Sequence, residues 1–343
     1  MRPFVYDRAT SVEEAIKAAL ALAKKPAGTA AAGPVNFLAG GTTLIDLMKL
    51  DVMRPERVID INPLERAGRQ GRIEASPQSL WLGGLVRMAD VMRHPEVARD
   101  YPVIVQSLAF AASAQLRNMA SLAGNVLQRT RCSYFRDTSW AACNKRDPGS
   151  GCAALDGVNR PHAVLGVSDH CIATYPGDFA QALIALDAKV EIAGVGGMRR
   201  IPFADLHRRP GDAPHIETVL QPGDLITGFE IPAAPWTRRS LYLKVRDRQS
   251  YEFALASAAV ALDLAEGVVR GARIALGGVA TVPWRAREAE AALAGKPLDE
   301  AAAKAAADAA FADATPRQHN AYKVPLGKAT LARALMQAGS MEI

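Results

Sequence analysis

The sequence has few of the features that mark exported, membrane-spanning or nucleic-acid-binding proteins. No apolar run in its 343 residues reaches the roughly 20 residues that span a bilayer. The opening segment, MRPFVYD, lacks the apolar core of a signal peptide. We therefore expect no membrane span and no export signal in the chain. It is expected to be cytoplasmic, or periplasmic by co-export with a signal-bearing partner.

Cysteine is scarce and unevenly placed. The only four cysteines, Cys132, Cys143, Cys152 and Cys171, fall in one loop-rich window. Two disulfides would be the ordinary interpretation of an even count, but such bridges are typical of small exported proteins. Thiols gathered in a single window favour a metal or cluster site instead.

The composition is that of a globular protein, with 49% hydrophobic and 22% charged residues. A chain of 343 residues is long for one core, so two or three subdomains are expected. The net charge is +6, but Lys and Arg alternate with Asp and Glu along most of the chain, and only residues 129–146 are locally basic. We therefore expect no nucleic-acid partner.

The residue patterns predict an α+β fold. Residues 1–60 read as a β-α-β-α-β unit, with strands at 3–6, 35–39 and 58–61 and helices at 12–24 and 44–50. Further strands are expected at 79–83, 162–167, 171–174, 189–193, 198–202 and 224–231, and helices at 88–92, 103–112 and 179–186. After the Pro-rich segment 232–235, three strands (241–245, 257–263, 271–277) precede three helices (283–294, 298–312, 321–337).

A glycine turn at residues 36–44 is the first candidate binding element. Its residues are Asn36, Phe37, Leu38, Ala39, Gly40, Gly41, Thr42, Thr43 and Leu44. The adjacent glycines tolerate positive φ and have no Cβ to block a ligand, and their N–H groups can form an anion-binding nest before a helix. Neither G-x-G-x-x-G nor G-K-[ST] is present, so this is neither a Rossmann fingerprint nor a P-loop. An ordinary tight turn is the alternative.

A second small-residue turn, Ser121-Leu122-Ala123-Gly124-Asn125, has the same character. Two such turns are suited to hold the two ends of an extended dinucleotide.

The cysteine spacing is C-x10-C-x8-C-x18-C, without any C-x-x-C pair. It matches neither a zinc ribbon nor a ferredoxin run, but a 4Fe-4S cubane needs only four convergent thiolates. Turn formers at 147–151 are suited to wrap a compact cluster, and nearby cations would offset its charge: Arg129, Arg131, Arg136, Lys145 and Arg146. Structural zinc is the alternative, with His162 or His170 replacing one thiolate.

Several segments resemble the FAD-binding subunit of the xanthine dehydrogenase (molybdenum hydroxylase) family over nearly the whole chain. They are Phe37–Thr42, Leu116–Asn118 with Gly124-Asn125, Lys244–Arg248, and Phe253–Ala256. The cysteine loop, absent from most of these subunits, is similar to that of bacterial three-subunit aldehyde oxidoreductases of the periplasmic type. One departure is Ala123, where many members have a second glycine.

The resemblance implies FAD and a 4Fe-4S cluster as cofactors. It implies that residues 36–44 wrap the FAD diphosphate and that Ser121, Gly124 and Asn125 form a second contact near Ala111. Asp178, Ile226 and Lys244 match flavin-contacting positions, and the four cysteines match cluster ligands. Without the resemblance, Asp178 would read as a helix N-cap and Lys244 as a solvated strand residue.

The resemblance also implies a two-lobed FAD-binding domain at 1–235 (lobes at about 1–60 and 61–235, cysteine loop at 126–172) and a C-terminal domain at 236–343 with a three-stranded antiparallel sheet and three helices. The expected function is electron transfer. Electrons would pass from a molybdenum-binding large subunit through a 2Fe-2S small subunit to FAD here, and then to an external acceptor. No side chain of this chain is expected to be catalytic. The alternatives are a flavin subunit of the 4-hydroxybenzoyl-CoA reductase or xanthine dehydrogenase type, or a zinc-stapled, non-redox assembly module.

Overall fold

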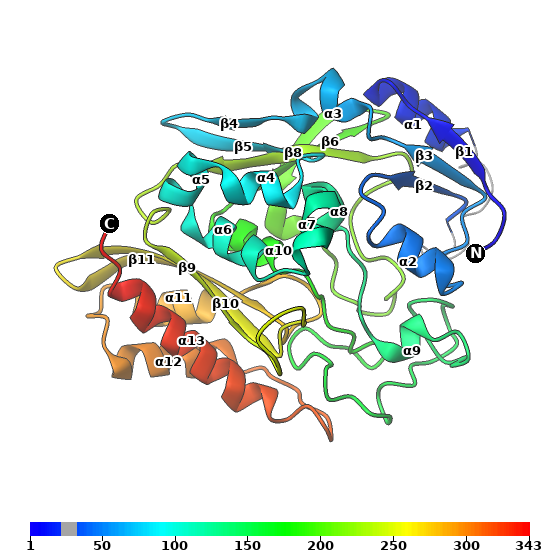
Figure 1. The fold of residues 1–343 in the computed structure, drawn as a ribbon. Helices are drawn as coiled ribbons and strands as arrows, with labels where there is room; N and C mark the ends of the chain where they lie inside the picture. The colour runs from blue at the N-terminus through cyan, green and yellow to red at the C-terminus, as the bar shows by residue number, and fades with distance from the viewer. Residues whose placement is uncertain (22–32) are drawn as a thin grey trace.

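The computed structural model describes residues 1–21 and 33–343, which form three sheets with helices packed between and around them (Figure 1). The first sheet is parallel, with strand order β1-β3-β2 (Val5–Arg8, Arg57–Asp60, Val35–Leu38). Helices α1 (Val12–Leu20) and α2 (Leu44–Lys49) belong to the same unit. The predicted β-α-β-α-β unit is therefore confirmed. Helix α1 ends earlier than predicted, and positions 22–24 of that prediction lie outside the described residues.

The second sheet is antiparallel and carries the middle of the chain. Its strand order is β4-β5-β8-β6-β7 (Ile73–Ala75, Ser79–Gly83, Leu225–Pro232, Lys189–Gly194, Gly197–Pro202). The hairpin predicted at its edge is the pair β6 and β7, which meet at Gly194 and Gly197. The pairing of β6 with β8 shifts by one residue beyond Glu191, where Glu191 faces Gly228 and Ile192 faces Ile226. Thr227 is thus an extra residue on β8, a β-bulge.

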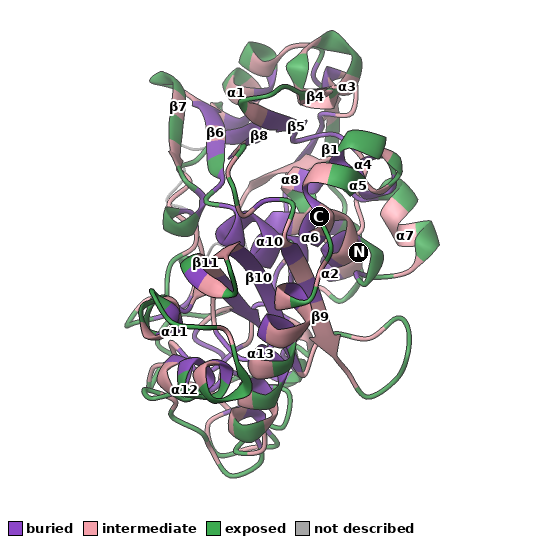
Figure 2. Cartoon of the chain, turned by 90° about the vertical axis from the view of Figure 1, so that its left-hand side faces the viewer, coloured by how far each residue is buried: buried purple, intermediate pink, exposed green. Residues whose placement is uncertain are grey.

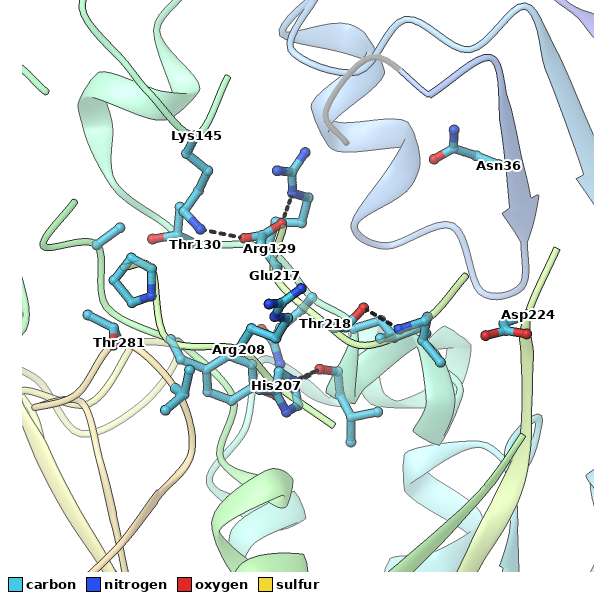
Figure 3. Close-up of a pocket in the computed structure, with 18 of the residues that line it drawn as sticks. Asn36, Arg129, Thr130, Lys145, His207, Arg208, Glu217, Thr218, Asp224 and Thr281 are labelled. Atoms are coloured by element: carbon cyan, nitrogen blue, oxygen red, sulfur yellow. Dashed lines mark hydrogen bonds and ion pairs between the residues drawn. The ribbon is translucent and has the colours of Figure 1, made fainter. Parts of the chain in front are cut away.

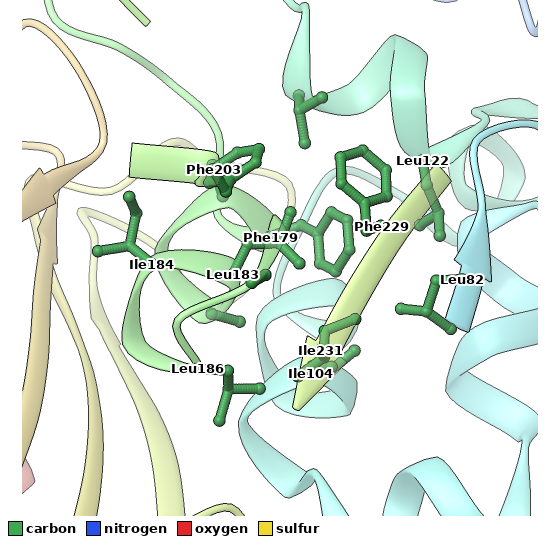
Figure 4. Close-up of a cluster of buried hydrophobic side chains, with 14 of the residues drawn as sticks. Leu82, Ile104, Leu122, Phe179, Leu183, Ile184, Leu186, Phe203, Phe229 and Ile231 are labelled. Atoms are coloured by element: carbon green, nitrogen blue, oxygen red, sulfur yellow. The ribbon is translucent and has the colours of Figure 1, made fainter. Parts of the chain in front are cut away.

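Short helices carry the rest of the chain before the C-terminal region. They are α3 (Leu64–Ala67), α4 (Met88–Arg93), α5 (Pro95–Asp100), α6 (Pro102–Ala109), α7 (Ala114–Met119), α8 (Leu122–Val126), α9 (Ser133–Arg136) and α10 (Phe179–Ala185), with 3-10 turns at Arg69–Gly71 and Phe203–Asp205. Helix α3 lies beside the first two sheets and α9 lies in the cysteine loop, whereas α4–α8 and α10 lie between the second sheet and the C-terminal region (Figure 1). Their core centres on Phe179, Phe203 and Phe229, which pack edge to face (Figure 4). All three rings are buried, so α10 and β8 form the rigid centre of the molecule (Figure 2).

The C-terminal region begins with an antiparallel sheet of order β12-β11-β10-β9 (Trp284–Arg285, Val268–Gly277, Ala256–Ala265, Ser240–Val245). Helices α11 (Arg287–Leu293), α12 (Glu300–Ala310) and α13 (Lys323–Gly339) follow. Strand β10 has the sequence ASAAVALDLA because both of its faces are covered. Ala258 and Val260 pack in the core with the C-terminal helices, whereas Ala259 and Ala261 pack in the core with α6 and α10. The three predicted strands and three helices are present, and a two-residue fourth strand was not predicted.

The strands predicted at 162–167 and 171–174 are wrong. These segments form only isolated bridges, Leu165 with Ala280 and Ser168 with Cys171. Their apolar residues are buried by irregular backbone that joins the cysteine loop to the C-terminal sheet, so hydrophobicity alone misled the prediction. Among the described residues, no helix combines the length and hydrophobicity that a membrane span requires.

Candidate functional site

Both predicted turns face one cavity of about 240 Å³. Most of the residues predicted to contact FAD line it: Asn36, Phe37, Ala39, Gly40, Gly41, Thr42, Thr43, Leu44, Ser121, Gly124 and Ile226. Leu38 packs instead against buried residues of α2 and of the cysteine loop. The Asn125 amide donates to Met88 Sδ at 3.5 Å, and its buried Oδ1 has no partner among the described residues. The two turns, more than 80 residues apart in sequence, therefore form one site.

The first turn presents free hydrogen-bond donors. Gly41 has a φ of +72°, which a glycine adopts without strain. In the described part of the chain, the backbone N–H groups of residues 40–43 have no hydrogen-bond acceptor. Unpaired N–H groups before the start of α2 are the arrangement that an anion-binding nest requires.

Gly40 is needed for a different reason from the one that the sequence suggested. A Cβ at this position would lie 2.0 Å from the carbonyl oxygen of Met119, so the missing side chain makes room for the chain before the second turn and not for a ligand. At Gly41 a Cβ would meet the flexible end of Ile45 at 2.8 Å, and the positive φ is the stronger constraint. The expectation that both glycines keep space open for the cofactor is corrected accordingly.

Two residues that the sequence reasoning missed join the turns. The Asn62 side chain donates to the carbonyl of Ala39 at 3.1 Å. Arg87 donates to Asn62 Oδ1 and to the carbonyl of Met119, both at 2.8 Å. Asn62 and Arg87 thus connect the backbone of the first turn to that of the second. No local sequence signal marks them, because the partners come from distant segments.

The second turn is the start of a short helix, α8. Ser121 is its N-cap, and its hydroxyl accepts a hydrogen bond from the N–H of Gly124 at 3.3 Å. The N–H of Ala123 donates to the carbonyl of Gly84, whose own N–H donates to Thr227 at 2.8 Å. The bulge at Thr227 therefore positions Ile226 next to the second turn.

Asp178 and Lys244 form a buried ion pair in a different part of the molecule. Lys244 Nζ lies 2.8 Å from Asp178 Oδ2, and the Tyr242 hydroxyl donates to Asp178 Oδ1 at 2.5 Å. Burial raises the pKa of Asp178, and the Lys244 ammonium opposes that rise. Asp178 makes no side-chain cap at the start of α10, and the Lys244 side chain is only 1% exposed, so the alternative structural roles do not apply.

Asp178 lines a second cavity, of about 260 Å³. A central cavity of about 360 Å³ lies between it and the cavity of the two turns (Figure 3). It shares Arg129 and Asp224 with the cavity of the two turns, and Thr130 and Tyr175 with the Asp178 cavity. The three cavities therefore share walls and lie side by side, an arrangement that suits an extended ligand. Ala111 lies in the core instead, at 4% exposure.

The structure gathers the four cysteines around one small cavity, together with Lys145 and His170. All four are free thiols, so the disulfide interpretation is wrong. Asn144 shapes this loop: its side-chain oxygen accepts from the N–H groups of Gly149 and Gly151 at 3.1 and 2.9 Å, and its amide donates to the carbonyl of His170. The turn at 147–151 was predicted, but the role of Asn144, which lies three residues before it, was not.

No metal site is shown. Across residues 1–21 and 33–343, no three His, Cys, Asp or Glu side chains are arranged to hold a metal ion. Burial raises the pKa of Cys132 to about 12 and that of Cys171 to about 11, so these thiols are protonated as they stand. His162 is buried with Nε2 3.1 Å from Cys132 Sγ, and His170 is exposed near Asp212.

The cations of the cysteine loop have partners other than the thiols. Arg131 and Arg136 pair with Asp46 on α2, and Arg129 and Lys145 pair with Glu217. Arg146 donates to backbone carbonyls within the loop. Only Lys145 also lines the thiol cavity, where its charge lowers the pKa of Cys171 against the effect of burial. That these cations offset the charge of a cluster stays a prediction.

The fold and these cavities define a flavoprotein of the molybdenum hydroxylases. Residues 2–234 match the FAD binding domain in molybdopterin dehydrogenase, and residues 241–338 match the CO dehydrogenase flavoprotein C-terminal domain. The chain belongs to this family of FAD-binding subunits and is the flavin component of an oxidoreductase.

Individual relatives refine this placement. The chain is 46% identical over 340 residues to the aldehyde oxidoreductase FAD-binding subunit PaoB of Escherichia coli, covering 98% of this chain and 99% of the relative. It is 26% identical to the glyceraldehyde dehydrogenase medium chain of Sulfolobus acidocaldarius, covering 87% and 83%. Among solved structures, a chain of carbon monoxide dehydrogenase from Hydrogenophaga pseudoflava matches with a TM-score of 0.73 and 26% identity, covering 98% of both chains.

Proposed function

We propose that the chain is the FAD-carrying electron-transfer subunit of a molybdenum-dependent aldehyde oxidoreductase. The observation that carries this proposal is the 46% identity to an aldehyde oxidoreductase subunit over 99% of that relative's length. Aldehyde oxidation would take place on a separate molybdenum-binding large subunit. Electrons would then pass through a 2Fe-2S small subunit to the flavin and on to an external acceptor.

Bound FAD would supply the electron-transfer chemistry, and the residues of this chain would bind and orient it. The free N–H groups of residues 40–43 suit the diphosphate. Asp178, which lines the second cavity and is paired with Lys244, suits the polar edge of the isoalloxazine.

The test of the aldehyde assignment uses the assembled complex. The chain is tagged and purified with its co-expressed partners, and flavin absorbance is followed without oxygen. An aromatic or aliphatic aldehyde should bleach the flavin, whereas xanthine or 4-hydroxybenzoyl-CoA should not. Bleaching by xanthine or by the thioester alone would replace this substrate class with one of the related alternatives.

We also propose that the four cysteines hold a 4Fe-4S cluster. This proposal is supported by four free thiols lining one cavity and by a loop whose shape Asn144 fixes. Cluster assembly would deprotonate the thiols and remove the cost of burying them. The contact of His162 with Cys132 at 3.1 Å favours the competing zinc site, in which an imidazole joins the thiolates.

Elemental analysis separates the two metals. Anaerobically purified protein should contain iron and acid-labile sulfide in equal amounts with little zinc. Cys143→Ser should lose the iron and keep FAD, while the matched loop variant Ser139→Ala, whose side chain is exposed, should keep both. Zinc without sulfide would refute the cluster, and full iron retention in Cys143→Ser would remove that residue from the ligand set.

A further inference from the structure

We infer that Arg129 is an additional FAD ligand whose guanidinium binds the diphosphate. The inference rests on the proposal that FAD occupies the cavity of the two turns. Arg129 lines both that cavity and the central cavity beside it. It is only 8% exposed, although it carries a permanent charge.

The hydrogen bonds of Arg129 are incomplete. Its Nε donates to Glu217 Oε2 at 2.5 Å. Nη1 and Nη2 are buried and have no partner among the described residues. In Figure 3 these two nitrogens lie on the side of the guanidinium away from Glu217. Buried polar groups are nearly always hydrogen-bonded, so two free N–H-bearing nitrogens beside a cavity indicate an acceptor that occupies it.

The charge balance around Glu217 indicates that the acceptor is an anion. Glu217 also accepts from Lys145 Nζ at 2.9 Å, so one carboxylate faces two cations. These two cations overcome the opposing effect of burial and lower the pKa of Glu217 to about 2. The group therefore keeps one net positive charge at neutral pH. The planar fork of an arginine matches the oxygens of a phosphate, which is why arginine is common in diphosphate sites.

The direction of Arg129 favours the diphosphate over the thiol cavity. The Arg129 guanidinium stacks on the Phe135 ring, with Cζ 4.7 Å from the ring centroid, so one face of the guanidinium is covered. Phe135 lines the cysteine cavity, whereas Arg129 does not. Arg129 is therefore separated from the thiols by an aromatic ring and remains open to the two cavities that the dinucleotide would fill.

The test uses the whole chain after reversible removal of flavin, with ADP and adenosine as probes of the diphosphate and of the nucleoside alone. Arg129→Met should weaken both FAD and ADP about 10- to 100-fold and leave adenosine binding unchanged. Arg129→Lys, which keeps the charge without the fork, should be intermediate. Arg200→Met is the matched control: it removes an exposed arginine that also pairs with carboxylates, and it should change nothing.

Three results would overturn the inference. They are unchanged ADP affinity in Arg129→Met, an equal loss of ADP and adenosine, or a loss of iron with unchanged ADP binding. Far-UV circular dichroism and urea unfolding establish that each variant is folded before binding is measured. A wild-type protein that binds no FAD would refute the proposed function itself, which is a different outcome from a variant-specific loss.

Discussion

The buried pair between Asp178 and Lys244 allows a quantitative test of how this site is built. The two side chains are 6% and 1% exposed. In Asp178→Asn the ammonium of Lys244 would remain buried with only neutral acceptors, such as the carbonyl of Phe110 at 3.0 Å. Breaking a buried pair by removing one partner costs about 3–5 kcal/mol, because an uncompensated charge is left in a low-dielectric interior. We expect a loss of that size in the free energy of unfolding.

Urea unfolding of the flavin-free protein measures this loss. The double variant Asp178→Asn with Lys244→Met removes both charges and should recover most of the stability. Asp247→Asn is the control, since the Arg160–Asp247 pair is about half exposed and screened by solvent, so its loss should change stability far less. A double variant as unstable as Asp178→Asn would refute the reasoning, as would an Asp178→Asn variant within about 1 kcal/mol of wild type. The affinity of the double variant for FAD should stay below that of wild type, because the charged side chains of Asp178 and Lys244 that would contact the flavin are absent.

Three further changes have defined outcomes. Gly40→Ala should lower stability and flavin content, because its Cβ would overlap the carbonyl of Met119. The control Gly196→Ala, whose Cβ would have no atom within 4 Å, should lower neither. Equal flavin content in the two variants would contradict the close contact between the two turns. Burial lowers the pKa of Lys323 from 10.5 to about 7, so the native state binds fewer protons between these values and stability should rise with pH there. In Lys323→Met, the urea midpoint should lose that rise. The pKa of Glu217 falls from 4.5 to about 2, so its contribution is present above 4.5 and is lost as the pH falls toward 2. Glu217→Gln should flatten acid unfolding across this interval, and an unchanged profile would contradict the pairing.

Local patterns in the sequence predicted most of the elements and both turns. Helix α10 and strand β5 follow from apolar spacing, and the turn at residues 36–44 follows from adjacent glycines, because these signals lie within a few residues of one another. The contacts that join the turns were beyond such reasoning. Arg87 and Asn62 acquire their roles only when distant segments meet, and the space left by Gly40 is filled by Met119.

The cysteine loop was also predicted only in part. Its clustering in the sequence predicted that the four thiols would meet, and they do line one cavity. Its neighbouring cations were expected to offset the charge of a cluster. Four of them pair with Asp46 or Glu217, which lie outside the loop, and Arg146 donates to carbonyls within it. Ion pairs with carboxylates from distant segments set the directions of those side chains, and the spacing of residues within the loop does not predict these pairs.

Flavin analysis of the purified chain tests the central claim most directly. Flavin released from the denatured protein is identified by chromatography and compared with the protein concentration. Two facing turns, the first of which has free N–H groups, predict one FAD for each chain, and a protein that contains FMN, or no flavin after reconstitution with FAD, would contradict the account.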